Sequence, residues 1–301
     1  MKKLVLLFSL CLIGTSVSYS QDYFQQFYNL FQEGDTAAMP AILQAWKKEK
    51  KDDPELSVAY FNYYVNVARR DVITLGQNPK GETVFEVQDT ANQENVGYLY
   101  GDVSYDSLFL QKGFYHIDKA IEAHPNRLDM RFGKIYMLGQ INDYAHFSQE
   151  IIEVITQSGK NKNAWTWAKG EAVQEGQEKM LSSIQEYIYQ IYQTGNDDLL
   201  IYLKDISEAV LDLYPDHVES LSNVSVYYLI QKEYNKALGF LLRAEKLAPE
   251  DPVVLANIAK SYLMLDDMPK AKAYYELVVK HGDERSKRFA QSQIMKIDSK
   301  N

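Results

Sequence analysis

Apolar residues recur with a helical spacing along most of this 301-residue chain. In residues 218–251 they fall on single faces of two successive helices, with Leu221, Val224 and Tyr228 on the first and Ala237, Leu241 and Ala244 on the second. A short polar stretch, 231–233, separates the two faces. The pattern predicts a pair of helices joined by a tight turn.

The same pattern returns 34 residues later, in 252–285. Matching positions hold similar side chains: Leu221 recurs as Leu255, Val224 as Ile258, Tyr228 as Tyr262, Ala237 as Ala271 and Leu241 as Tyr275. Pro249 ends the first block, because proline does not continue a helix, and Asp251 offers a side-chain cap for the next helix. Self-similarity at a fixed period of this length is typical of a solenoid.

These residue types resemble the tetratricopeptide repeat (TPR). Small residues stand at Ser225 and Ala259, and the alanines open the second helix of each block. The chain departs from the family pattern where leucine replaces the usual tryptophan and where Asp283 replaces a second proline. The resemblance implies an all-α, right-handed solenoid of antiparallel helix pairs that binds a protein or peptide through its concave face.

The remaining helical patterns fit a diverged version of the same plan. We expect helices over 22–31, 36–51, 55–72, 106–124, 127–141, 143–155, 177–194 and 197–214. A polar helix over 284–297 would cap the solenoid. The expected organisation is a diverged helical region over 21–157, a loop over 158–175 where two halves would meet, and a C-terminal repeat region over 176–301.

Residues 73–105 interrupt the helical period with several glycines and a proline. Alternating runs over 83–87 and 96–100 predict a small β-hairpin or a packed irregular loop. Long insertions of this kind are often functional. Two interpretations remain open: the insertion covers the end of the N-terminal core, or it is a binding element that uses Tyr98 and Tyr100.

The loop over 158–175 carries Trp165 and Trp167. Residues two apart in an extended segment face the same way, so the two rings could form a stacking platform for a sugar or a peptide. The alternative is that they are buried as a plug beneath the loop.

The first 20 residues have the pattern of a secretory signal peptide. Lys2 and Lys3 precede an apolar run over 4–13, and small residues precede a cleavage point after Ser20. Cleavage would remove Cys11, the only cysteine, and would change the formal net charge from −9 to −11. An acidic chain is a poor nucleic-acid ligand, and no later apolar run is long enough to span a membrane. We therefore expect a periplasmic or secreted bacterial protein.

No motif for catalysis, metal binding or a cofactor is found, since HExxH, Gly-rich phosphate-loop and GxSxG patterns are missing and the five histidines are scattered. We expect a non-enzymatic scaffold, with no cofactor, for a protein or peptide partner in the cell envelope. Its binding candidates are Asn223, Asn257, Lys260 and Met264 on the inner groove. The alternative is a glycan or small-ligand module built on Trp165, Trp167, Tyr98 and Tyr100. The oligomeric state stays open.

Overall fold

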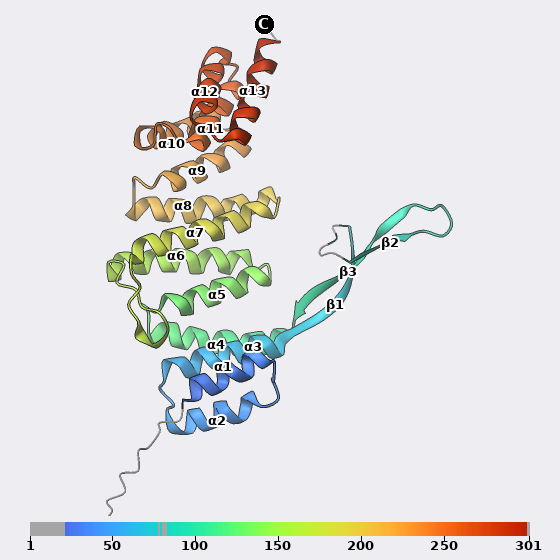
Figure 1. Ribbon diagram of the computed structural model, residues 1–301, viewed down its shortest axis with the longest axis vertical. Coiled ribbons are helices and arrows are strands. Elements are labelled where there is room, and N and C mark those ends of the chain that lie inside the picture. Colours follow the sequence, from blue (N-terminus) through green and yellow to red (C-terminus); the bar gives the residue numbers. More distant parts are fainter. Residues whose placement is uncertain (1–21, 78, 80–82, 300–301) are drawn as a thin grey trace, which may run out of the picture.

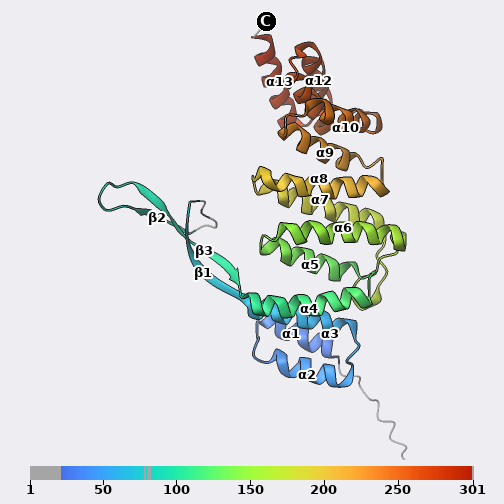
Figure 2. The same ribbon diagram turned by 180° about the vertical axis from the view of Figure 1, so that it is seen from behind.

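A computed structural model describes residues 22–77, 79 and 83–299, so the predicted signal peptide lies outside the described residues. Helices stack in neighbouring antiparallel pairs from the N-terminal to the C-terminal end, and a slender three-stranded sheet projects from one side (Figures 1 and 2). The predicted fold class, a right-handed TPR-like α-solenoid with a small β insertion, is confirmed.

The described residues form thirteen α-helices, two short 3-10 turns and three strands. The helices are α1 (Tyr23–Glu33), α2 (Met39–Glu49), α3 (Pro54–Ala68), α4 (Ser107–Ala123), α5 (Leu128–Gln140), α6 (Tyr144–Asn161), α7 (Gly176–Gln193), α8 (Leu200–Leu213), α9 (Val218–Ile230), α10 (Tyr234–Leu247), α11 (Pro252–Met264), α12 (Met268–His281) and α13 (Glu284–Asp298). The 3-10 turns are η1 (Ala168–Gly170) and η2 (Asp197–Leu199), and the strands are β1 (Arg69–Gly76), β2 (Val84–Gln88) and β3 (Asn95–Tyr105).

The same type of backbone turn connects the two helices in four of the pairs. A residue in the left-handed conformation follows the first helix of each pair, and these residues are Gly34, Asn142, Lys232 and Asp266. In every case the next residue donates its N–H to the carbonyl five positions back, as Glu233 does to Tyr228 and Asp267 does to Tyr262. This is a standard helix C-terminal motif. Its recurrence shows that α1–α2 and α5–α6 repeat the geometry of α9–α10 and α11–α12 although their side chains have diverged.

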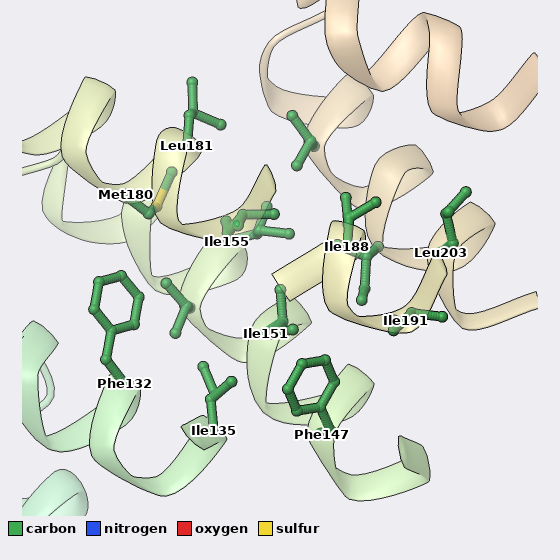
Figure 3. Close-up of a cluster of buried hydrophobic side chains, with 14 of the residues drawn as sticks. Phe132, Ile135, Phe147, Ile151, Ile155, Met180, Leu181, Ile188, Ile191 and Leu203 are labelled. Atoms are coloured by element: carbon green, nitrogen blue, oxygen red, sulfur yellow. The ribbon is translucent and has the colours of Figure 1, made fainter. Parts of the chain in front are cut away.

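The largest core cluster spans α5, α6, α7 and α8. Figure 3 shows its centre, where Phe132 and Ile135 of α5 face Phe147 and Ile151 of α6, with Met180 and Ile188 of α7 above them. Trp165, from the loop before α7, is part of the same cluster and is only 1% exposed. The core is therefore continuous across the loop.

Helix α6 also extends further than expected, to Asn161 rather than to about residue 155. A Cβ added at Gly159 would lie 3.3 Å from a methyl group of Leu213, so glycine lets α6 approach α8 closely. The hydroxyl of Ser158 donates to the carbonyl of Ile155 at 2.6 Å and lies 3.0 Å from the hydroxyl of Tyr214. The polar composition of this stretch suggested a loop, whereas it serves helix–helix contact.

Helix α3 is shorter than predicted and ends at Ala68 rather than at Val72. The next residues form β1, which pairs antiparallel with β3 from Arg69–Tyr105 out to Gly76–Tyr98, while β2 pairs with the other edge of β3. Asp106 donates its N–H to the carbonyl of Ala68 at 2.8 Å and closes the base of the sheet. The local apolar spacing suits a helix or a strand, and pairing with a distant segment decides between them. We call the sheet of β1, β2 and β3 the arm.

A buried charge network ties the N-terminal helices to the loop before α7. Arg127, which is 4% exposed, donates from both terminal nitrogens to the carboxylate of Glu55, at 2.8 and 3.2 Å, and also pairs with Asp129 at 2.7 Å. Glu55 accepts a further bond, of 2.7 Å, from the backbone N–H of Lys169. Burial acts to lower the pKa of Arg127, but the hydrogen bonds to Asp129 and Glu55 outweigh it and raise that pKa.

Replacing Arg127 should destabilise the fold strongly. Arg127→Met leaves the buried carboxylate of Glu55 without its cation, and breaking a buried pair in this way costs about 3–5 kcal/mol. Urea unfolding followed by circular dichroism measures the change. Lys119→Ala, which breaks the exposed Lys119–Glu122 pair, is the control and should have little effect. Equal, small effects of both substitutions would contradict the role given to the network.

The start of α9 should make the fold sensitive to mild acid. Nδ1 of His217 accepts the backbone N–H of Ser220 at 3.3 Å, which only the unprotonated ring nitrogen does. Burial lowers the pKa of His217, while the carboxylate of Glu219, 3.4 Å from Nε2, acts to raise it. The unfolded chain therefore takes up the proton more readily. The contribution of His217 to stability is complete above a pH of about 6.5 and is lost as the pH falls through the lowered pKa.

His217→Asn tests this dependence, because asparagine keeps the cap acceptor and does not titrate. The free energy of unfolding of the variant should fall less than that of the wild type between about pH 6.5 and 5. His116, whose pKa is lowered by burial and then by Lys47, stays in both proteins and accounts for a remaining slope. Identical slopes in wild type and variant would show that the His217 cap does not titrate in this way.

Candidate functional site

Side-chain amides link the first helices of three consecutive pairs. Oε1 of Gln185 on α7 accepts from Nδ2 of Asn223 on α9 at 2.8 Å. Toward the next pair, Nδ2 of Asn257 on α11 lies 3.5 Å from the hydroxyl oxygen of Ser222 on α9, at the limit of a hydrogen bond. We call Gln185, Ser222, Asn223 and Asn257 the amide row. The structure thus brings together two asparagines that the sequence predicted as binding residues.

Lys260 and Met264 continue the row along α11. Positions 257, 260 and 264 are three and four residues apart, so they share one face of the helix. Lys260 is exposed, and Met264 is 50% exposed although it is apolar. Three of the four residues predicted for the inner groove therefore share one face of α11, and Asn223 lies on the neighbouring helix α9.

A hollow of about 790 Å³ opens beside the Gln185 end of the row. It lies between the first turns of α7 and the start of α9, and its wall includes Ser182, Gln185 and His217. Three carboxylates, those of Glu175, Glu178 and Glu219, also line it, against one lysine, Lys162. This excess of negative charge favours an occupant with cationic or N–H donor groups.

Gln185 has a donor that the fold does not use. Its Nε2 is buried and has no hydrogen-bond partner among the described residues, while its Oε1 is engaged by Asn223. Buried polar groups without a partner are uncommon in folded proteins, and each calls for an explanation. The sequence analysis missed Gln185 because α7 carries no clear copy of the repeat pattern.

The two tryptophans do not share a surface. Trp165 is buried at 1% exposure in the α5–α8 core, whereas Trp167 is 37% exposed and meets the ring of Phe132 edge to face, at 6.3 Å between ring centres. Between them, Thr166 exchanges backbone hydrogen bonds with Asn126 and Leu128, both at 2.9 Å, which fix the loop against the α4–α5 turn. Trp165 acts as the plug, and a two-ring platform is not formed.

The two tyrosines belong to the arm, away from the tryptophans. Figures 1 and 2 show the arm leaving the solenoid on the side opposite the loop before α7. Tyr100 is 7% exposed and covers Gly76, where an added Cβ would lie 2.9 Å from the tyrosine hydroxyl oxygen. Tyr98 is half-buried. The residues predicted for a glycan site are therefore divided between two distant places, and two of the four are buried.

A hollow of about 930 Å³ lies between α1, α2, the α4–α5 turn and η1. Its acidic groups already have partners: Asp53 accepts from Nε1 of Trp46 at 2.9 Å, and Glu55 binds Arg127. Nζ of Lys169 lies 4.7 Å from the centre of the Phe24 ring. Sequence reasoning missed this hollow because it joins segments more than 100 residues apart. Its contacts hold the fold together rather than leaving groups for a ligand.

Neither a metal site nor a membrane span is found in the described part of the chain. No group of three or more His, Cys, Asp or Glu side chains within residues 22–77, 79 and 83–299 could hold a metal ion. Over the same residues, none of the helices combines the length and the apolar character needed to cross a bilayer.

Several solved structures resemble this chain in fold, at low sequence identity. No family model and no curated protein matches the chain. The C-terminal part of a TPR repeat-containing protein from Cytophaga hutchinsonii is 14% identical over 92% of this chain and 96% of that chain, with a TM-score of 0.41. A tetratricopeptide repeat protein from Parabacteroides merdae is 9% identical over 91% and 97%, with a TM-score of 0.31. Yeast Tom70 is 9% identical over 92% and 60%, with a TM-score of 0.35. Likeness at this level carries no argument about function, and the TPR-like architecture rests on the chain's own period and helix pairs.

Proposed function

We propose that this chain is an exported scaffold that holds a segment of another cell-envelope protein on the surface formed by the amide row, Lys260 and Met264. The observation that carries the proposal is the amide row itself, which crosses three helix pairs and ends at a hollow with an unused buried donor.

This surface suits a polypeptide better than a small molecule. An extended or helical peptide presents groups at regular intervals, and side-chain amides can both donate to and accept from them. The row supplies such groups on successive helices, with exposed Met264 as an apolar contact. The carboxylates at the hollow favour a lysine, an arginine or an amino terminus at one end of the bound segment.

Export is part of the proposal and is supported by the charge and apolar pattern of residues 1–20. An acidic mature chain without a cysteine is compatible with an oxidising envelope compartment, since it has no thiol to oxidise. The glycan alternative is not carried forward, because Trp165 and Tyr100 are buried.

Site-specific photo-crosslinking in the cells that make the protein tests the binding surface. A photoreactive residue at Lys260 or Met264 should capture one protein at high yield, and Gln185→Leu with Asn223→Leu should reduce that capture by about tenfold or more. The control places the same group at Lys272, a half-buried position on α12, the second helix of the pair. Equal capture from Lys272, or capture that survives loss of both amides, would contradict binding at the amide row.

The mature amino terminus tests export separately. The protein recovered from the envelope fraction should begin at Gln21, which intact-mass measurement determines directly. A positive n-region is needed for a signal peptide to work, so Lys2→Glu with Lys3→Glu should leave unprocessed chain in the cytoplasm. A full-length chain beginning at Met1 in the soluble cytoplasm of wild-type cells would refute export.

A further inference from the structure

A second row of side chains accompanies the amide row. Each amide of that row, on α7, α9 and α11, is followed seven residues later by an exposed aromatic or aliphatic side chain. The three side chains are Tyr192 on α7, Ile230 on α9 and Met264 on α11, and they are 55%, 37% and 50% exposed. We call them the apolar row.

The two rows lie side by side on one surface. The helices of each pair are antiparallel, so the first helices α7, α9 and α11 all run in the same direction. The amide contacts between them align the three helices at the amide row. Seven residues make about two helical turns, which bring a side chain back to the same face about 10 Å further along. Tyr189, which is 61% exposed, and half-buried Tyr227 lie between the rows.

The step from one helix to the next restricts the conformation of a bound segment. Packed helices lie about 8–10 Å apart. A polyproline II helix returns to the same face at every third residue, about 9 Å further on, so it presents one side chain to each helix. Side chains on one side of an extended β-strand are about 7 Å apart, a spacing that falls out of step over three helices.

The amide row distinguishes a polyproline II segment from an α-helix. Residues seven apart in an α-helix also have a suitable spacing, of about 10 Å, but an α-helix uses its backbone N–H and C=O groups internally. A polyproline II backbone has no internal hydrogen bonds, so its carbonyl groups are free to accept from side-chain amides. The buried Nε2 of Gln185, which has no partner among the described residues, is a donor of the required kind.

We propose that this surface binds a proline-rich segment in the polyproline II conformation. The segment lies across α7, α9 and α11, with every third side chain on the apolar row and its carbonyl groups toward the amide row. The tyrosines suit such an occupant, because grooves lined by aromatic side chains recognise proline-rich segments. The inference rests on the proposed scaffold function and names the class of segment that the scaffold holds.

The charges along the surface give the segment two different ends. At the α7 end, the carboxylates of Glu175, Glu178 and Glu219 line the hollow beside Gln185. At the α11 end, Lys260 is exposed. Complementary charge therefore favours a lysine or arginine of the segment at α7 and a carboxylate at α11.

Fluorescence polarisation with labelled synthetic peptides tests the inference. The probe has three leucines, one at every third position among prolines, with lysine at one end and glutamate at the other, and it is made in both chain directions. One direction should bind the chain from Gln21 with a dissociation constant on the order of 10–100 μM. A peptide of the same composition with its three leucines adjacent should bind at least about tenfold more weakly, because it places only one leucine on the apolar row.

Variants of the protein locate the binding. Tyr192→Ser with Met264→Ser removes both ends of the apolar row and should weaken binding of the probe by more than about tenfold. The matched control is Tyr115→Ser with Leu247→Ser. It removes an exposed tyrosine and an exposed aliphatic side chain from the second helices α4 and α10, and should leave the affinity unchanged.

Four results would overturn the inference. They are no binding of the probe in either direction up to about 1 mM, equal binding of the peptide with adjacent leucines, equal loss in the control variant, and tighter binding of an alanine-rich α-helical peptide with leucine at every seventh position. Failure of the scaffold itself has a different signature. If photo-crosslinking at Lys260 or Met264 captures a protein but the probe does not bind, the scaffold function stands and the polyproline II segment is wrong.

Discussion

The structure depends on one constraint: a pair of helices has more apolar surface than it can bury by itself. Helix α11 shows how the solenoid meets it. Its residues Val254 and Ile258 belong to the core cluster with α9 and α10, while its residues Leu255 and Ala259 belong to the cluster with α12 and α13. Helices α3 and α5 are divided between two clusters in the same way, and each pair is stable only because its neighbours cover it.

Stacking also requires successive pairs to present the same shape. The recurring left-handed turn provides this, because it sets the direction in which the second helix of a pair returns. Gly34, Asn142, Lys232 and Asp266 adopt this conformation although only one of them is glycine. Residues other than glycine adopt the left-handed conformation at some cost in free energy. Because three of the four turns nevertheless use such residues, helix packing rather than local preference maintains the turn.

Where the repeat pattern is weakest, contacts between segments far apart in the chain connect the helices. The loop before α7 carries Trp165 into the α5–α8 core, and its backbone reaches Glu55 through Lys169. These ties make the N-terminal region continuous with the rest of the solenoid. Two features lie outside these ties: the amide row, whose contacts run between the first helices of three pairs, and the arm, which takes no part in the stacked core.

The sequence alone determined the repeat architecture, because the 34-residue period and the helical spacing of Leu221, Val224 and Tyr228 depend only on local order and on burial of one face. It also predicted that Asn223 and Asn257, which are equal positions 34 residues apart, lie on neighbouring first helices. Only the tertiary structure determined the burial, contacts and secondary structure of residues outside the period. Trp165 is buried, Gln185 joins the amide row, and the segment after Ala68 becomes a strand, because each outcome is set by a contact with a residue far away in the chain. Local patterns specify which face of an element is apolar, but they do not specify what will cover it.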